Sequence, residues 1–259
     1  MIEIRGLSKT VDGKLVLDGV DLDVNRGEIF GVLGPNGAGK TSLFQCVAGL
    51  WAPQTGTIRI DGKERFADGD AIRKFTFFLP DRPYANPGET GREHLELIAE
   101  LYGIEDELAV RQLEDLSSAF ELDEVIDQPV STYSNGQYKK VCIAGAFISN
   151  SRLLILDEPF TGEIDPPGMA NMKSMLTELC RRHGVTCLLS TQIVPLATEL
   201  CERIAVLHHG RVKARGTIAE IVAAAGIVEG GLERVLTELV GKNAQAAGLD
   251  FVSSVGRGG

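Results

Sequence analysis

Apolar and polar residues alternate in short segments over the first eighty positions of the chain. Residues 20–24 place valine or leucine between aspartates, a period of two that predicts a strand with one buried face. Residues 57–60 alternate in the same way and lead into Asp61-Gly62, a dipeptide favoured in turns between antiparallel strands. Apolar runs at 29–33 and 75–79 add to this strand-like pattern. The first third of the chain is therefore expected to contain strands and hairpins.

A helical period replaces this alternation after a loop punctuated by prolines at 80, 83 and 87. Between about residue 90 and residue 149, apolar residues recur three or four positions apart and so share one helix face. Examples are Ala109, Leu113, Leu116 and Phe120. This segment is expected to be a helical insertion.

The second half of the chain alternates strands with helices. Apolar runs at 153–156, 185–189 and 204–207 are separated by helical segments, a pattern typical of parallel strands covered on both faces. Together these elements predict an α/β fold. From about residue 226 we expect one helix over 232–239, followed by a loosely ordered end with Gly, Ala and Ser.

Composition and charge narrow the class of protein. A length of 259 residues fits one domain with an inserted subdomain as well as two domains. The net charge of -10, with scattered Lys and Arg, argues against a nucleic-acid partner, which normally requires a concentrated basic patch.

The five cysteines and the apolar segments indicate a compartment. The cysteines form no C-x-x-C pair, and their odd number favours reduced thiols in a reducing cytoplasm. No apolar stretch approaches the 18 residues that a membrane span needs, so we expect a soluble chain, which leaves a membrane-embedded partner open.

A phosphate-binding pattern follows the apolar run at 29–33. The motif G-x-x-x-x-G-K-[ST] is matched at every fixed position by Gly34, Pro35, Asn36, Gly37, Ala38, Gly39, Lys40 and Thr41. Glycines let the N–H groups point inward, and the start of the following helix attracts phosphate. Lys40 is expected on the β- and γ-phosphates, and the Thr41 hydroxyl on Mg²⁺. The motif predicts an ATP or GTP site, against the alternative of a glycine-rich turn.

Two carboxylates end the apolar run at 153–156. Asp157 and Glu158 would lie at the carboxyl end of a buried parallel strand, where open α/β sheets bind ligands. Asp157 is expected to hold Mg²⁺ through water, and Glu158 to accept a hydrogen bond from the attacking water. The alternative is a strand end followed by an acidic turn.

A capped helix start is predicted shortly before that strand. Ser134 with Gln137 three residues later forms a capping box, with Asn135 and Gly136 between them. A helix start with a glycine also exposes N–H donors to an anion, so a structural cap and an anion site are compatible.

In this order, the motifs resemble the ATP-binding cassette ATPases, the nucleotide-binding subunits of ABC transporters, and within them the export-type group. The resemblance covers about 1–225 and includes the signature-like Tyr-Ser-Asn-Gly-Gln of 133–137 and a D-loop-like segment with Asp165 in its aspartate position. It implies a P-loop NTPase core with a mixed sheet, an N-terminal antiparallel β subdomain and an inserted α-helical subdomain. We expect the core at 1–80 and 150–225, the helical subdomain at about 82–149, and a C-terminal extension at 226–259.

The resemblance also implies partners and a composite site. Two such subunits, identical or different, would sandwich two ATP molecules head to tail, each phosphate loop with Ser42 facing the partner's Ser134 and Gly136. The helical insertion and the loop from Asp81 to Tyr84 would transmit the cycle to a transmembrane permease subunit. The protein would then lie on the inner face of the cell membrane.

Three positions depart from the family pattern. Val11 replaces an aromatic that stacks on adenine, a contact worth about 1–3 kcal/mol in nucleic-acid sites, which predicts weaker ATP affinity. Asp81 falls where a glutamine is usual and is expected near Mg²⁺, with a solvated loop aspartate as the alternative. Gln192 occupies the switch-histidine position and can donate to a γ-phosphate but cannot become a cation. We expect slow hydrolysis; a nucleotide sensor with little turnover and a soluble non-transport ATPase are the alternatives.

Overall fold

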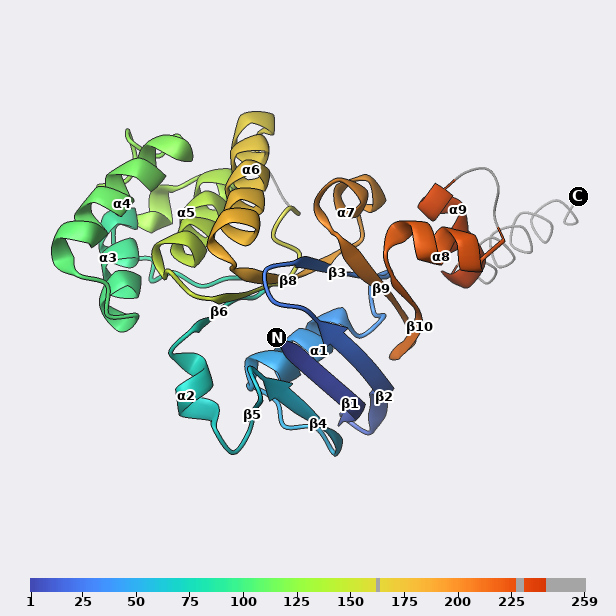
Figure 1. Ribbon diagram of the computed structural model, residues 1–259. Helices are drawn as coiled ribbons and strands as arrows, with labels where there is room; N and C mark the ends of the chain where they lie inside the picture. The colour runs from blue at the N-terminus through green and yellow to red at the C-terminus, as the bar shows by residue number, and fades with distance from the viewer. Residues whose placement is uncertain (162–163, 227–230, 241–259) are drawn as a thin grey trace, which may run out of the picture.

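The protein is described here by a computed structural model that covers residues 1–161, 164–226 and 231–240. It contains two sheets, with helices between and above them (Figure 1). The helix expected over 232–239 is present as α9 (Gly231–Val240), whereas the predicted loose end at 241–259 lies outside the described residues.

The smaller sheet is antiparallel and has the strand order β2-β1-β4-β5. Its strands are β1 (Ile2–Val11), β2 (Lys14–Val24), β4 (Thr55–Ile60) and β5 (Lys63–Glu64). The predicted alternation at 20–24 is confirmed, because Val20, Leu22 and Val24 are buried. The turn at Asp61-Gly62 is also confirmed, with φ of 56° and 77° as a tight hairpin requires.

The larger sheet has six strands in the order β10-β9-β3-β8-β7-β6. All neighbours pair in parallel except β10, which runs antiparallel to β9, so the expected mixed sheet is confirmed. The strands are β3 (Ile29–Leu33), β6 (Thr76–Leu79), β7 (Leu153–Leu156), β8 (Thr186–Thr191), β9 (Arg203–His208) and β10 (Arg211–Gly216).

The two faces of the larger sheet belong to two separate cores. On one face, Phe30 and Val32 of β3 pack with helix α1 (Lys40–Ala48) and the buried side of the antiparallel sheet. On the other, Ile29 and Leu33 join the core formed with the remaining long helices. Helix α1 therefore lies between the two sheets (Figure 1). Both faces of the strands are covered, which explains their uninterrupted apolar sequences.

Helices of the second core follow from the predicted periodicities. They are α3 (Gly91–Leu101), α4 (Asp106–Ala119), α5 (Asn135–Ile148), α6 (Pro166–His183), α7 (Val194–Leu200) and α8 (Ile218–Ala224), with the short α2 (Gly69–Arg73) elsewhere. Leu113, Leu116 and Phe120 are buried on one side of α4, and Ala109 is half-buried beside them. The division into subdomains at the expected boundaries stays a prediction.

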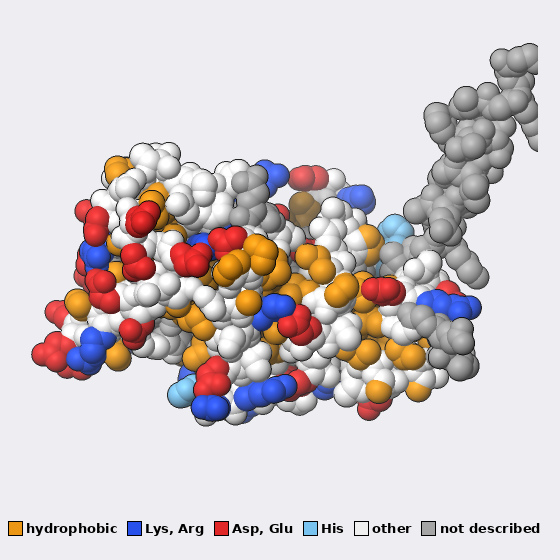
Figure 2. Space-filling view, turned by 90° about the horizontal axis from the view of Figure 1, so that it is seen from above, with side chains coloured by type: hydrophobic (Ala, Val, Ile, Leu, Met, Phe, Trp, Pro, Cys, Tyr) orange, Lys and Arg blue, Asp and Glu red, His pale blue; other side chains and the backbone are white. Residues whose placement is uncertain are grey.

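Acidic charge is unevenly distributed over the surface of the molecule. Acidic side chains gather over the α3–α4 end of the molecule in Figure 2, where α4 carries Asp106, Glu107, Glu114 and Asp115.

All five cysteines are buried and free. Within the described residues, no helix combines the length and apolar character that crossing a bilayer requires.

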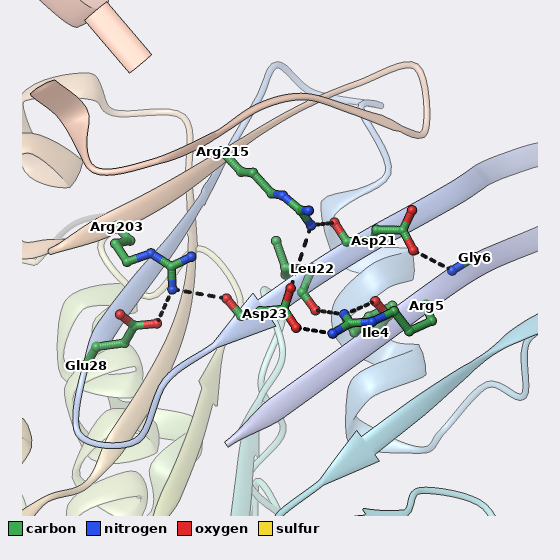
Figure 3. Close-up of polar contacts among 9 residues, drawn as sticks. All are labelled: Ile4, Arg5, Gly6, Asp21, Leu22, Asp23, Glu28, Arg203 and Arg215. Atoms are coloured by element: carbon green, nitrogen blue, oxygen red, sulfur yellow. Dashed lines mark hydrogen bonds and ion pairs between the residues drawn. The ribbon is translucent and has the colours of Figure 1, made fainter. Parts of the chain in front are cut away.

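A network of arginines and carboxylates connects the two sheets (Figure 3). Arg203 of β9 pairs with Glu28 at 3.1 Å between Nη1 and Oε1 and donates to the Asp23 carbonyl. Arg215 of β10 donates to the Asp21 carbonyl at 2.8 Å, and Arg5 of β1 pairs with Asp23. Glu28 is buried, so its ion pair with Arg203 is more strongly shielded from water than the ion pair of Arg5 with Asp23.

Replacing Arg203 with alanine should destabilise the fold. The loss is expected to be about 2 to 4 kcal/mol, because Glu28 loses its cation but keeps two hydrogen bonds from Asn25. Arg211→Ala is the matched control, since its pair with Asp18 is exposed and should cost less than about 1 kcal/mol. Urea unfolding of both variants measures the difference, and equal losses would contradict this account.

Candidate functional site

A cavity of about 360 Å³ brings together most of the residues predicted to bind phosphate and metal, although Gly34, Pro35 and Asp157 are not in its wall. Its walls include the phosphate loop from Asn36 to Ser42, Asp81 after β6 and Glu158 after β7. The start of β2 and the turn between β9 and β10 complete it with Lys14, Leu15, Val16, His209 and Gly210. The sequence motifs did not indicate this second set, because those residues reach the loop only through the tertiary fold.

The phosphate loop is held in the expected strand–loop–helix setting. It leaves β3 and enters α1, where Gly39 has a φ of 106° and a side chain would meet the Val16 carbonyl at 2.7 Å. The Gly210 N–H donates to the Ala38 carbonyl at 2.9 Å and ties the β9–β10 turn to the loop. No side chain caps the start of α1, so its N–H donors remain suited to an anion.

Lys40 joins the phosphate loop to Glu158. Its Nζ donates to the Gly34 carbonyl at 2.8 Å and to the Pro35 carbonyl at 3.3 Å. It also lies 3.1 Å from Oε1 of Glu158, and both side chains are less than one tenth exposed. This buried ammonium therefore lies between the loop expected to hold phosphate and the carboxylate of Glu158.

Ser190 holds the two carboxylate residues together. Its Oγ accepts from the Glu158 N–H at 2.8 Å and donates to Oδ1 of Asp157 at 2.5 Å. Asp157 is fully buried, and Glu158 has a φ of 48°, which side-chain-bearing residues seldom adopt. No sequence motif includes Ser190, although a serine near the carboxyl end of a buried strand is a usable signal.

The oxygen atoms around the cavity fit Mg²⁺ held together with a nucleotide. Oδ2 of Asp157 and Oε2 of Glu158 are buried without a hydrogen-bond partner, and Oε1 of Glu158 faces the ammonium of Lys40. The Thr41 and Asp81 side chains line the same cavity. Oxygen ligands supplemented by phosphate are what Mg²⁺ prefers. Among the described residues, no group of three or more His, Cys, Asp or Glu forms a metal site by itself.

The signature-like segment forms the predicted capped helix start, which is not part of the wall of this cavity. The Ser134 hydroxyl accepts from the Gln137 N–H at 3.2 Å, and Oε1 of Gln137 accepts from the Ser134 N–H at 2.9 Å, which confirms the capping box. Ser134 and Asn135 are exposed. None of Ser134, Asn135, Gly136 and Gln137 belongs to the wall of the cavity in the described structure.

Asp165 caps α6 and pairs with Lys140 of α5, the signature helix, which begins at Asn135 in the signature-like segment. Its Oδ1 accepts from the Gly168 N–H at 2.7 Å, and its Oδ2 lies 2.5 Å from Nζ of Lys140. The hydrogen bond from Lys140, followed by that from Gly168, lowers the pKa of the Asp165 carboxyl. Lys140 is buried, and the sequence analysis did not single it out.

Two of the departures from the family pattern lie outside the described wall of the cavity. Val11 ends β1 opposite Lys14 and is half-buried, while Gln192 follows β8 and is exposed. The third departure, Asp81, does line the cavity. The structure therefore places Asp81 and Glu158 in the cavity wall with the phosphate loop, and it does not place Val11 or Gln192 in that wall.

The site geometry agrees with comparisons to known proteins. Residues 17–161 match the family described as ABC transporter. The chain is 36% identical over 225 residues to the daunorubicin/doxorubicin resistance ATP-binding protein DrrA of Streptomyces peucetius, covering 87% of this chain and 68% of that protein. This chain belongs to the ABC transporter family.

Two further similarities extend over most of the chain. The Nod factor export ATP-binding protein I of Sinorhizobium fredii is 33% identical over 94% of this chain and 72% of its own length. A solved structure of an ATP-binding subunit of an ABC transporter superposes with a TM-score of 0.86 at 33% identity, covering 92% of this chain and 99% of that one. This ABC protein is thus an ATP-binding subunit with ATPase activity, and its fold is the expected cassette.

Replacing Ser190 with alanine tests the constraint on the two carboxylates. ATP turnover should fall by about 10-fold to 100-fold, because small misplacements of catalytic groups have effects of that size. ATP binding should change little, since Ser190 is not part of the cavity wall. Steady-state phosphate release and equilibrium ATP titration separate the two effects.

Ser149→Ala is the matched control for this measurement. Ser149 is also buried and donates to a main-chain carbonyl, that of Ala146, at the far end of α5. Its loss should lower stability by about 1–3 kcal/mol and leave turnover unchanged. Wild-type turnover in Ser190→Ala would show that Ser190 does not position the carboxylates.

Proposed function

We propose that this chain is the ATP-hydrolysing subunit of an ABC exporter and that it closes with a second such subunit around two ATP molecules. The proposal rests on one observation: the start of α5 is not part of the cavity that the phosphate loop forms in the same chain. Lys40, Thr41, Asp81 and Glu158 share one cavity, whereas the capped start of α5 at Ser134 is exposed and outside it. An exposed, capped helix start with free N–H donors is suited to the γ-phosphate bound by another subunit.

Lys40 acts as the switch between the resting and the loaded site. The γ-phosphate attracts its ammonium away from Glu158, which lies 3.1 Å from it. Glu158 then accepts a hydrogen bond from the attacking water and takes up its proton as the bond from water to the γ-phosphorus forms and the bond from that phosphorus to the bridging oxygen breaks, which releases ADP and phosphate. Ser190 keeps the Glu158 main chain in place during this exchange.

Mg²⁺ and the nucleotide complete the set of charges. Bound Mg²⁺ would neutralise charge on the β- and γ-phosphates, with Thr41 as a direct ligand and Asp157 and Asp81 as direct or water-mediated ligands. The free, buried Oδ2 of Asp157 supports this assignment. The loop residues from Gly34 to Ser42 supply main-chain donors to the phosphates.

The signature-like and D-loop-like residues of this subunit would contact the partner subunit and its nucleotide. Ser134, Asn135, Gly136 and Gln137 contact the partner's nucleotide, and Asp165 lies at the junction next to them through its pair with Lys140. Whether the two subunits are identical or different is set by the surfaces around these motifs.

A transmembrane permease subunit is the second proposed partner. Tyr84, Leu97 and Leu101 are large apolar side chains that are 76%, 45% and 73% exposed, on the loop after Asp81 and on α3. Such exposure indicates a surface that a partner covers. Docking there would place the subunit on the inner face of the cell membrane, where ATP is available. Export is supported by the names of the relatives, drug resistance and Nod factor export.

Glu158→Gln should separate ATP binding from hydrolysis. Turnover is expected to fall by about 100-fold or more, because glutamine cannot accept the proton of the attacking water. ATP should then trap a dimer that light scattering on a sizing column detects, whereas wild type forms one only transiently. Glu178→Gln, an exposed residue of α6 paired with Arg182, is the control and should behave as wild type. A stable wild-type dimer without phosphate release would favour the nucleotide-sensor alternative.

Gln192→His should accelerate hydrolysis in this subunit. A histidine N–H can donate to the γ-phosphate and, when protonated, add positive charge that glutamine lacks. Gln192 is exposed, so the substitution should leave the free energy of unfolding within about 0.5 kcal/mol of wild type. Steady-state ATPase assays compare the two forms, and a histidine variant no faster than wild type would exclude Gln192 as the rate-limiting departure.

A further inference from the structure

A buried lysine next to the signature-like motif joins two main-chain segments of the catalytic centre. Lys139 lies on the first turns of α5 and is 8% exposed. Its Nζ donates to the Asp81 carbonyl at 3.3 Å and to the Glu158 carbonyl at 3.3 Å. One ammonium therefore connects the signature helix, the loop after β6 and the turn after β7.

The neighbouring Tyr138 holds the same loop at two further points. Its hydroxyl accepts from the Ala85 N–H at 2.8 Å and donates to the Pro83 carbonyl at 3.1 Å. The α5 residues that directly follow Gln137 thus bind the 81–85 segment through three main-chain groups. A displacement of that segment cannot occur without moving the start of α5 or breaking these bonds.

The surroundings of Lys139 explain why a cation is retained at a buried position. Burial lowers the pKa of its ammonium, while the carboxylates of Asp81, Asp157 and Glu158 and the thiol of Cys142 act in the opposite direction. A buried charge seldom stabilises a protein more than an apolar side chain of similar volume. The position of Lys139 is therefore better explained by what it connects than by stability.

Of the two main-chain carbonyls that Lys139 binds, that of Glu158 belongs to the more constrained residue. This residue has a φ of 48°, and its carbonyl also accepts from the Thr161 N–H at 3.2 Å and the Thr161 hydroxyl at 2.7 Å. Because φ and ψ fix the direction of the side chain, holding this carbonyl helps to hold the carboxylate opposite Lys40.

We propose that Lys139 is a positioning residue that links the 81–85 loop to the catalytic carboxylate of Glu158 within one subunit. The proposal rests on the proposed function, in which Glu158 orients water and the loop next to Tyr84 meets the permease. A movement of the loop on the membrane side then changes the orientation of Glu158 through one ammonium, with no contact between Lys139 and the nucleotide.

Lys139→Met tests the link in the full chain, because methionine fills a similar volume without charge or donors. The turnover number should fall by about 10-fold to 100-fold with little change in KM, as expected when a catalytic group is misplaced. Lys173→Met is the matched control, since Lys173 binds Glu199 between α6 and α7, far along the chain from these motifs. It should retain wild-type turnover.

A double variant shows whether Lys139 acts through Glu158. Adding Lys139→Met to Glu158→Gln should cause no further loss of residual turnover, because the group that Lys139 positions is already inactive. Losses that multiply would overturn the proposal, as would a single variant whose turnover stays within about twofold of wild type.

Amide hydrogen exchange provides a readout that does not depend on turnover. Lys139→Met should speed exchange at Glu158 and Thr161, whereas Tyr138→Phe should speed it at Ala85 and leave Glu158 unchanged. Unaltered exchange at Glu158 and Thr161 in Lys139→Met would overturn the link. If wild type releases no phosphate from ATP, the proposed function fails, and the exchange result still decides whether Lys139 makes the connection.

Discussion

Parallel pairing of β8 with β3 on one side and β7 on the other is the constraint on which the site depends. The register sets Leu33 beside Thr191 and Leu156 beside Leu189, so three strands end at one edge of the sheet. The phosphate loop and the two carboxylates follow directly after β3 and β7, and Ser190 is the second-last residue of β8. Because each strand is buried on both faces, a shift in register would exchange side chains between the two cores, disrupt their packing and separate the groups that perform the chemistry. The strand pairing that stabilises the sheet therefore also fixes the geometry of the site.

Two buried lysines from different parts of the chain contact Glu158 at this edge of the sheet. Lys40 approaches the side chain of Glu158 from the phosphate loop, and Lys139 approaches its main chain from the signature helix. The first contact can be exchanged for phosphate, because it is made by flexible side chains. The second is made to a main-chain carbonyl, which a phosphate does not replace. One cation can therefore respond to the nucleotide, while the other keeps Glu158 linked to the 81–85 loop.

Local patterns predicted much of this arrangement from sequence. The phosphate loop, the Ser134 capping box and the strand before Asp157 were found because their defining residues are adjacent in the chain or spaced by one helical turn. Ser190, Lys139, Lys140 and His209 were missed, because each acquires its partners only when distant strands and helices pack together. Val11 and Gln192 were identified by their place in a motif, yet motif position did not indicate that they lie outside the cavity wall of the described chain.

The burial of every cysteine has a consequence for measuring this protein. Burial raises the pKa of the Cys46 thiol to about 11 and those of Cys142, Cys180 and Cys201 to about 12, and it raises that of Cys187 as well. Thiolate is the form that reacts with maleimides and oxidants, so the native thiols are inert near neutral pH. A single cysteine introduced at an exposed position outside the composite site, such as Glu178, can then carry a spectroscopic label without removing any native cysteine. Distances between two such labels would report the closing of one subunit on another in real time.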